Sequence, residues 1–253
     1  DHLLSIKEKA LVAYLVAGDP DLDSTLNLMH LFVESGVDII EVGVPFTDPI
    51  AEGPVIQKAH DRALKNNISL PKIIKLVEDF RKNDNSTPII LMGYLNTFSY
   101  HKNLIDNSDQ HGVDAVLVVD IPGELSISSY GISNPNIDSI SLISPTTSEE
   151  RIEKIAKNGS GFIYYVTLRG VTGSSNLDVK EINTNIQKIR SYSDIPTLAG
   201  FGIKSNEDAK LLSEYSDGII VGSSIVDMID KQSDSKDFDR IGKYLRELKN
   251  AIL

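Results

Sequence analysis

The feature of this sequence that most limits its fold is a series of short apolar segments that recur along the whole chain. Each segment is continuously apolar, whereas a strand with one face in water would alternate apolar and polar residues. Continuous segments of this kind predict parallel strands that are covered on both faces. We expect eight of them, starting at Leu11, Val37, Thr87, Ala115, Asp138, Gly161, Ile195 and Asp217.

Helical patterns fill the spaces between these predicted strands. Apolar residues share one helical face at Ile73, Ile74, Val77 and Phe80, and again at Ile241, Tyr244, Leu245, Leu248 and Ile252. Helix starts are predicted at Asp23-Ser24, Ser148-Glu149-Glu150 and Ser205-Asn206-Glu207. Residues 124–137 are rich in Ser, Gly, Asn and Pro, which predicts a short or broken helix there.

Strands that alternate with helices over 253 residues, without a linker rich in Pro or Gly, predict one closed barrel. We therefore expect an α/β fold of the (β/α)8 TIM barrel type, with residues 1–253 forming a single domain. An open, doubly wound sheet has the same periodicity and stays the alternative, because periodicity does not report closure.

The charge and the composition exclude several classes of function. With 36 acidic and 25 basic residues, the chain has a net charge of -11, which would repel nucleic acid and anionic membranes. The absence of cysteine from the sequence excludes thiolate catalysis and fits a reducing compartment, so we expect a cytoplasmic protein. No apolar run in the sequence approaches the ~20 residues of a membrane span.

The loops after the seventh and eighth predicted strands carry the signals of a phosphate site. The first of them contains Gly200 and Gly202, and the second reads Val221-Gly222-Ser223-Ser224. Glycines let backbone N–H groups approach an anion, and serine hydroxyls can donate to it. Because phosphate sites in barrels commonly form at these two loops, the pair favours a phosphate ligand over simple turns.

Carboxylates gather after the second predicted strand. Glu41 interrupts an otherwise apolar strand, and such a carboxylate either pairs with a cation or has a raised pKa that suits a proton donor. The sequence supports the ion pair and the proton donor equally well. Glu52 precedes Gly53-Pro54, where an acidic group also fits the start of a helix, and a turn explains Asp48.

Other polar residues at strand ends have a functional and a structural interpretation. Asp19 and Asp120 follow the first and fourth strands, where barrels place functional groups, but a hydrogen bond to a neighbouring loop explains them equally. Residues 167–176 form a long polar loop that could cover a ligand or serve only as a connection.

Several chemistries lack their motifs in the sequence. The five histidines have no metal-ligand spacing, the G-x-S-x-G motif is absent, and no lysine ends a predicted strand, as a Schiff-base aldolase would require. What remains is acid-base chemistry by carboxylates on a phosphorylated small molecule.

Two longer motifs resemble signatures of the tryptophan synthase alpha chain family. They are the segment from Glu41 to Pro54 and the segment Gly170-Val171-Thr172-Gly173. Shorter matches follow in family order: Gly18-Asp19-Pro20, Tyr94-Leu95-Asn96, Val119-Asp120-Ile121-Pro122, Gly200-Phe201-Gly202 and Gly222-Ser223. The resemblance covers nearly the whole chain.

The resemblance implies a TIM barrel lyase of tryptophan biosynthesis, which cleaves indole-3-glycerol phosphate to indole and glyceraldehyde 3-phosphate. It implies that Glu41 protonates the indole C3 carbon and that Glu52 stabilises the positive charge at the indole N–H. It also implies no cofactor in this chain and an α2β2 heterotetramer with a β chain that holds pyridoxal phosphate and takes up the indole.

The resemblance further assigns the residues around the substrate. Those expected to bind it are Tyr14, Tyr94, Leu117, Tyr164, Thr172, Gly173, Gly202, Gly222 and Ser223. The last four should hold the phosphate, and Thr172 should hydrogen-bond the carboxylate of Glu52. Pro45, Asp48 and Asn96 fall in loops that the family turns toward its β partner.

One residue departs from the family pattern, which has Asp where this chain has Glu52. The extra methylene moves the carboxylate by roughly 1 Å, and such a shift can cost about 100-fold in rate unless the loop resettles. Because the charge survives, we expect the role of this residue to survive. The alternative is a catalytically weakened phosphate-binding barrel that mainly activates its β partner.

Overall fold

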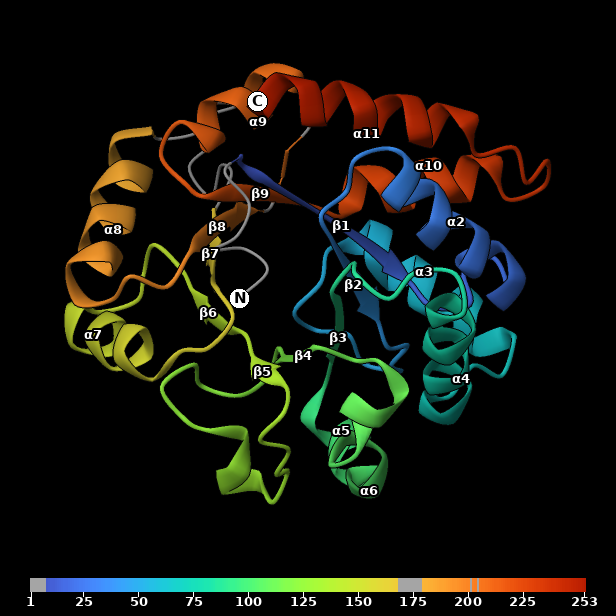
Figure 1. Cartoon of the computed structure of the whole chain (residues 1–253), viewed down its shortest axis with the longest axis horizontal. Helices are drawn as coiled ribbons and strands as arrows, with labels where there is room; N and C mark the ends of the chain where they lie inside the picture. Colours follow the sequence, from blue (N-terminus) through green and yellow to red (C-terminus); the bar gives the residue numbers. More distant parts are fainter. Residues whose placement is uncertain (1–7, 168–178, 201, 204) are drawn as a thin grey trace.

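The computed structural model describes residues 8–167, 179–200, 202–203 and 205–253. Parallel strands occupy the centre of the molecule and helices surround them (Figure 1). The strands of the described residues are β1 (Ala10–Val16), β2 (Ile39–Gly43), β3 (Ile89–Gly93), β4 (Ala115–Val118), β5 (Asp138–Ser139), β6 (Ser141–Ile143), β7 (Ile163–Val166), β8 (Thr197–Gly200) and β9 (Gly218–Val221). Each lies on one of the eight apolar segments, which confirms the prediction of parallel strands.

Chain continuity between β5 and β6 closes the sheet into a barrel. The hydrogen-bonded order runs β5-β4-β3-β2-β1-β9-β8-β7-β6, so the two ends of the order are β5 and β6. Only Ile140 separates them, and its backbone N–H donates to the carbonyl of Val116 on β4 at 2.9 Å. The two short strands therefore act as the fifth of eight barrel positions. This closure favours the predicted TIM barrel over the open sheet.

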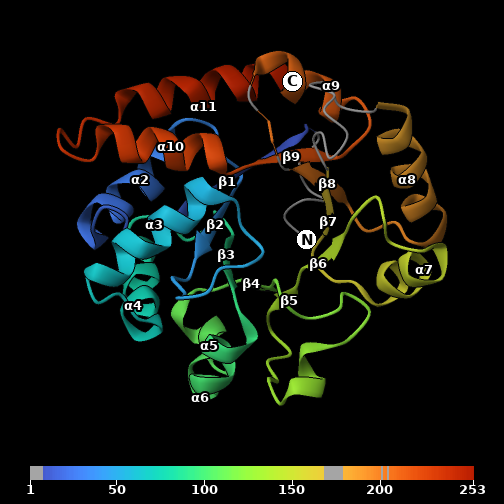
Figure 2. The same ribbon diagram turned by 180° about the vertical axis from the view of Figure 1, so that it is seen from behind.

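Helices cover the outside of the strands when the barrel is seen from either end (Figures 1 and 2). The α-helices of the described residues are α2 (Leu22–Glu34), α3 (Pro54–Lys65), α4 (Leu70–Arg81), α5 (Leu95–Tyr100), α6 (Lys102–Ile105), α7 (Glu149–Asn158), α8 (Val179–Tyr192), α9 (Asn206–Ser213), α10 (Ser223–Gln232) and α11 (Asp239–Ile252). Two short 3-10 helices are η1 (Ser108–His111) and η2 (Ile127–Tyr130). No described helix is long and apolar enough to cross a membrane.

The helical predictions agree with the structure except at one start. The apolar faces predicted near residues 73–80 and 241–252 belong to α4 and α11. The weak segment 124–137 contains only the short helix η2, as expected. Ser148 and Ser205 are N-caps, but the N-cap of the first helix is Asp21, two residues before the predicted Asp23-Ser24, and its side chain accepts the N–H of Ser24.

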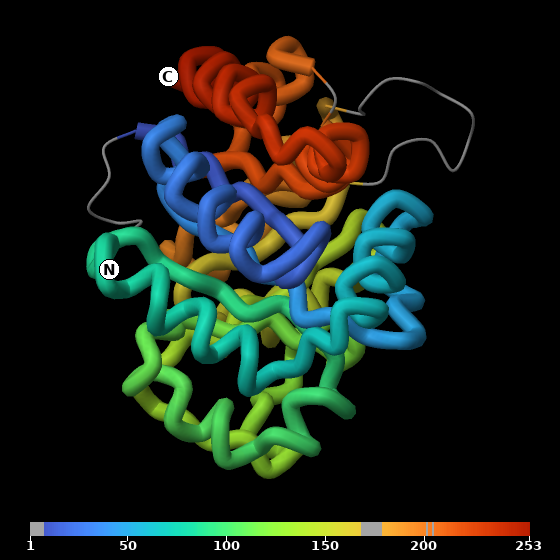
Figure 3. Tube along the Cα trace, turned by 90° about the vertical axis from the view of Figure 1, so that its right-hand side faces the viewer, coloured from blue at the N-terminus to red at the C-terminus, as the bar shows by residue number. Residues whose placement is uncertain are grey.

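The C-terminal helices pack against the N-terminal part of the chain and stabilise the barrel there. Helix α11 lies against α2, and α10 lies against β1, as the side view in Figure 3 shows. The pairing of β1 with β9 adds backbone hydrogen bonds to the same junction. Early and late segments of the chain therefore stabilise each other.

Alternate residues along the strands face the barrel interior. One cluster of buried side chains fills that interior and consists of Ala10, Val12, Ile39, Ile90, Ala115, Leu117, Ile140, Phe162, Leu198 and Ile220. The residues between them on the same strands pack outward against the helices. Both faces of the strands are thus buried, which is the physical reason for the continuous apolar segments in the sequence.

Two of the predicted N-caps provide a matched test of local helix stabilisation. Ser205 accepts the N–H of Asp208, and the Asp208 side chain accepts the N–H of Ser205, whereas Ser148 makes no side-chain cap hydrogen bond. Ser205→Ala should therefore lower the free energy of unfolding by about 1 kcal/mol and the melting temperature by about 2–4 °C. Ser148→Ala is the control and should change the melting temperature by less, as thermal unfolding followed by circular dichroism would measure. Equal losses in both variants would contradict the assigned cap.

Candidate active site

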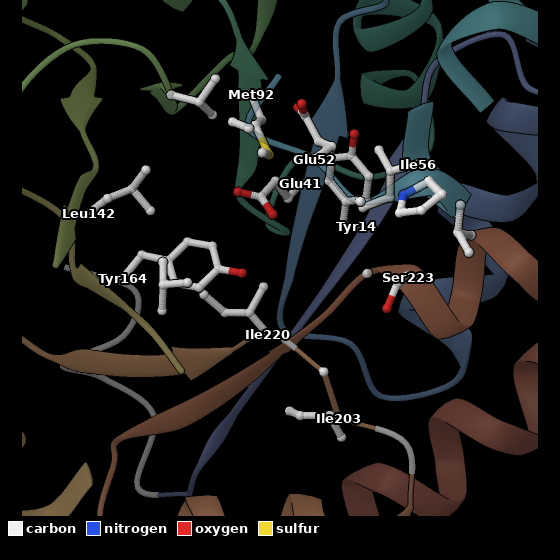
Figure 4. Close-up of a pocket in the computed structure, with 18 residues that line it drawn as sticks. Tyr14, Glu41, Glu52, Ile56, Met92, Leu142, Tyr164, Ile203, Ile220 and Ser223 are labelled. Atoms are coloured by element: carbon white, nitrogen blue, oxygen red, sulfur yellow. The ribbon is translucent and has the colours of Figure 1, made fainter. Parts of the chain in front are cut away.

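A cavity of about 310 Å³ opens where the strands end, above the apolar interior of the barrel. Residues of β1, β2, β3, β6, β7 and β9 and of the segments that follow β2, β4, β8 and β9 border this space. Its walls are Tyr14, Glu41, Ala51, Glu52, Gly53, Pro54, Val55, Ile56, Met92, Val119, Leu142, Tyr164, Val166, Gly202, Ile203, Ile220, Gly222 and Ser223 (Figure 4). Most of these side chains are apolar, so the few polar groups among them determine what can bind.

Glu41 is the carboxyl at the base of this cavity. It lies on β2 opposite Tyr14 of β1, and only 2% of its surface is exposed. Its Oε1 has no hydrogen-bond partner among the described residues. Burial raises the pKa of the Glu41 carboxyl to about 8, and the negative charge of Glu52 adds to the rise.

These surroundings decide between the two interpretations that the sequence leaves open for Glu41. The carboxyl points into the open centre of the cavity, as does the hydroxyl of Tyr164 (Figure 4). No cation of the described residues compensates it. The group is therefore protonated near neutral pH and can donate a proton to a bound molecule.

Glu52 borders the same cavity from the loop that precedes α3. The Tyr94 hydroxyl donates a hydrogen bond to its Oε2, and the N–H of Ala51 donates to the same hydroxyl oxygen at 3.0 Å. Burial raises the pKa of Glu52 above its ordinary value, and the hydrogen bond from Tyr94 offsets part of that rise by favouring the charged form. The two glutamates thus lie in different electrostatic environments, one without a donor and one with a donor.

Two tyrosines reach over glycines of neighbouring strands. A Cβ at Gly43 would lie 2.3 Å from the Tyr14 hydroxyl oxygen, and a Cβ at Gly200 would lie 2.9 Å from that of Tyr164. Only glycine therefore lets each ring lie in its place above the adjacent strand. The pKa of Tyr164 is raised because the ring is buried, so its hydroxyl stays protonated.

The loops after β8 and β9 meet at one side of the cavity. Gly202 has a φ of +73°, a conformation that favours glycine, and Gly222 precedes the first residue of α10, Ser223. The Ser224 hydroxyl donates to the carbonyl of Ile203 at 2.8 Å, which ties the two loops together. The N-terminus of α10 therefore faces the cavity and can attract an anion.

The structure brings many of the predicted substrate-binding residues to this cavity, but not all of them. Tyr14, Tyr164, Gly202, Gly222 and Ser223 line it. Tyr94 lies behind Glu52 with 2% of its surface exposed, and Leu117 lies deeper in the barrel interior. The predictions for Thr172 and Gly173 fall outside the described residues.

Three aspartates near strand ends have structural partners. Asp19 accepts two hydrogen bonds of 2.7 Å from the Arg62 guanidinium, and Asp120 accepts the N–H of Leu95 at 2.8 Å. Asp48 accepts the hydroxyl of its neighbour Thr47. A hydrogen bond to a neighbouring segment thus accounts for Asp19 and Asp120.

The residues predicted to face a partner differ in exposure. Asp48 and Asn96 are exposed, whereas Pro45 is buried. The loop after β2, which holds Pro45 and Asp48, also exposes Ile50, with 84% of its surface in contact with solvent.

His60 also belongs to this region, although the spacing of the histidines in the sequence predicts no site for it. It lies on the apolar face of α3 together with Ala59 and Ala63, and the N–H of Phe46 donates to its Nδ1 at 2.9 Å. A histidine on the apolar side of the helix that follows Glu52 is the signal that could have found it. Among the described residues, no group of three or more His, Asp or Glu could hold a metal ion.

Comparisons with known proteins agree on one family. The family model described as "Tryptophan synthase alpha chain" matches residues 1–252. The chain is 42% identical to the tryptophan synthase alpha chain of Nitrosomonas europaea over 99% of this chain and 92% of that protein. It is 45% identical to that of Neisseria gonorrhoeae over 96% and 94% of the two chains.

Solved structures give the same result. The crystal structure of the tryptophan synthase alpha chain of Legionella pneumophila has a TM-score of 0.87 and 36% identity, and it covers 99% of this chain and 94% of that chain. A chain of the tryptophan synthase α2β2 complex of Pyrococcus furiosus has a TM-score of 0.85 and 34% identity, with 96% and 99% coverage.

The raised pKa of Glu41 should make the protein less stable as the pH rises. Between pH 4.5 and 8 the unfolded chain loses this proton while the folded protein keeps it, so the free energy of unfolding falls across that window. Glu41→Gln has no proton to lose and should gain stability relative to the original protein, more at pH 8 than at pH 5. Urea unfolding at several pH values measures the difference.

Glu150→Gln is the matched control for this prediction. The pKa of Glu150 is lowered by its hydrogen bond with Lys154, so its replacement should bring no gain that grows with pH. If the stability of Glu41→Gln stayed parallel to that of the original protein from pH 5 to pH 8, the raised pKa of Glu41 would be wrong.

Proposed function

The chain belongs to the tryptophan synthase alpha chain family, and we propose that Glu41 and Glu52 divide between them the chemistry of the family reaction. That reaction cleaves indole-3-glycerol phosphate to indole and glyceraldehyde 3-phosphate and belongs to tryptophan biosynthesis. It breaks one carbon-carbon bond, so it needs a proton at the ring carbon and an acceptor for a hydroxyl proton.

Glu41 acts as the general acid in this proposal. Because its pKa is raised to about 8, the carboxyl carries a proton at neutral pH and can give it to the indole C3 carbon. Once the proton has left, the same carboxylate can accept the proton of the glycerol hydroxyl next to the bond that breaks. The electron pair of that bond returns to the ring, and the aldehyde leaves as glyceraldehyde 3-phosphate.

Glu52 stabilises the charge that this protonation creates. A proton on C3 places positive charge on the indole nitrogen, and a carboxylate that accepts the indole N–H lowers the energy of that state. The hydrogen bond from Tyr94 favours the charged form of Glu52, as this role requires. Different environments for two acidic groups in one site are typical of such a division of roles.

The rest of the cavity suits the two ends of the substrate. Met92, Val119 and Leu142 offer an apolar wall for the indole ring, beside Tyr14 and Tyr164. Gly222 and Ser223 form the N-terminus of α10, where backbone N–H groups and the helix dipole attract a phosphate, and Gly202 borders the same cavity from the loop after β8. Leu117 then supports the cavity floor from below, and Thr172 and Gly173 keep their predicted roles over the substrate.

One observation carries this proposal: a buried carboxyl without a compensating cation among the described residues faces an apolar cavity that has a helix N-terminus on its rim. An apolar ring and a phosphate in one ligand match the two halves of that cavity. A carboxyl with a raised pKa supplies the proton that the reaction consumes.

The proposal extends to partner, cofactor and compartment. Its supports are the exposed residues Asp48 and Ile50 in the loop after β2, the exposed Asn96 at the start of α5, and the membership of a family with α2β2 complexes. We propose an α2β2 heterotetramer in the cytoplasm, a β chain that holds pyridoxal phosphate, and no cofactor in this chain. Pro45 shapes the exposed loop from its buried position, and residues 1–253 form one domain.

Glu41→Gln tests the general acid. The variant keeps the shape of the side chain and removes its proton, so indole release should fall by about 100- to 10,000-fold. The measurement is the rate of indole formation from indole-3-glycerol phosphate by the purified chain. Retention of more than a few per cent of the original rate would reject the role of Glu41.

Glu52→Asp and Glu52→Ala test the second carboxylate together with the rival function, a weakened barrel that mainly activates its partner. Because the family has Asp at this position, Glu52→Asp should preserve or raise the rate, whereas Glu52→Ala should lower it by about 100-fold. Indole is measured with and without a β chain. A Glu52→Asp rate as low as that of Glu52→Ala would contradict the role of Glu52, and β-chain activation without indole release by the original protein would favour the rival.

A further inference from the structure

His60 is a buried, titratable side chain beside the site that the proposed chemistry does not use. Helix α3 carries it on the face with Ala59 and Ala63, and 1% of its surface is exposed. Burial lowers the pKa of the imidazole to about 4, so the ring is neutral at neutral pH. A neutral imidazole has one N–H donor and one acceptor nitrogen, and its surroundings select which is which.

The backbone of the loop after β2 fixes the tautomer of this ring. The N–H of Phe46 donates to Nδ1 at 2.9 Å, so Nδ1 is the acceptor and the proton resides on Nε2. Phe46 itself is held in place, because its ring stacks on that of Tyr94 with the centroids 4.6 Å apart. The imidazole is therefore oriented by a segment that also contacts the hydrogen-bond donor of Glu52.

The protonated nitrogen faces two groups of the site. Nε2 lies 3.5 Å from the Tyr14 hydroxyl oxygen and 3.9 Å from Oε1 of Glu52. The other carboxylate oxygen of Glu52 accepts the hydrogen bond from Tyr94. The carboxylate thus lies between the hydroxyl of Tyr94 and the N–H of His60.

We infer that His60 is a positioning residue for Glu52, an inference that rests on the proposed role of Glu52 as the carboxylate that stabilises the indole N–H. A glutamate side chain has three rotatable bonds, and one hydrogen bond leaves its carboxylate free to turn. The Nε2–H of His60 lies 3.9 Å from the oxygen that Tyr94 does not bind, and this dipole-to-charge contact, longer than a hydrogen bond, favours one orientation of the carboxylate. His60 also contacts the hydroxyl of Tyr14, whose ring forms part of the cavity wall.

Two variants test the roles of the two ring nitrogens of His60 one at a time. In His60→Asn the amide oxygen can take the place of Nδ1 and accept the Phe46 N–H, but no donor reaches Glu52. In His60→Gln the amide nitrogen can take the place of Nε2, but the Phe46 N–H loses its acceptor. His60→Asn should therefore lower kcat by about 10-fold with KM changed less than about two-fold, because a displaced catalytic group slows the chemical step. His60→Gln should keep kcat within about three-fold of the original but unfold at a lower temperature, since it buries an unpaired N–H.

A double-mutant cycle with Glu52→Gln tests whether His60 acts through Glu52. The rate of indole formation at saturating indole-3-glycerol phosphate is measured for the full chain, both single variants and the His60→Asn, Glu52→Gln double variant. If His60 acts through Glu52, adding His60→Asn to Glu52→Gln should lower kcat less than about two-fold further.

The outcomes of the cycle are distinguishable. An equal, roughly 10-fold loss from His60→Asn in both backgrounds overturns the positioning role while leaving the role of Glu52 intact. A Glu52→Gln variant as fast as the original protein overturns the proposed role of Glu52 and this inference with it. A fall in melting temperature without a fall in kcat for His60→Asn makes the residue merely structural and also overturns the inference.

Discussion

The free energy cost of a carboxyl group buried without a cation determines how the rest of this site is built. Glu41 lies in the apolar barrel interior, so its neutral form is favoured and its proton is available to a ligand. This state requires apolar surroundings, which the inward-facing residues of the strands provide. It also requires space above the carboxyl, and Gly43 and Gly200 leave room for the two tyrosines at its sides.

Much of this arrangement could be predicted from sequence, because its causes are local. The continuously apolar segments report burial on both faces, and the single glutamate within one of them marks the acidic group of the cavity. The glycines after β8 and β9 report close backbone approach at the α10 N-terminus. Ser148 and Ser205 could be recognised as N-caps because a hydroxyl before an acidic turn is a local signal.

The features of the site that the sequence does not predict depend on contacts between residues far apart in the chain. The hydrogen bond from Tyr94 to Glu52 joins the loops after β3 and β2, and His60 reaches the same carboxylate from a helix. No pattern within a single segment encodes either contact. The choice of Asp21 rather than Asp23 as N-cap depends on backbone torsions, which neighbouring acidic residues do not reveal.

The junction at Ile140, between β5 and β6, affects where the barrel opens locally. Here closure depends on strands of two and three residues, and only the short helix η2 replaces a full helix on the outside. Fewer backbone bonds and less apolar cover reduce the free energy needed for local opening. Amide protons along this junction should exchange with solvent sooner than those of β1 and β2, so the barrel is one continuous curved sheet whose weakest closure lies between β5 and β6.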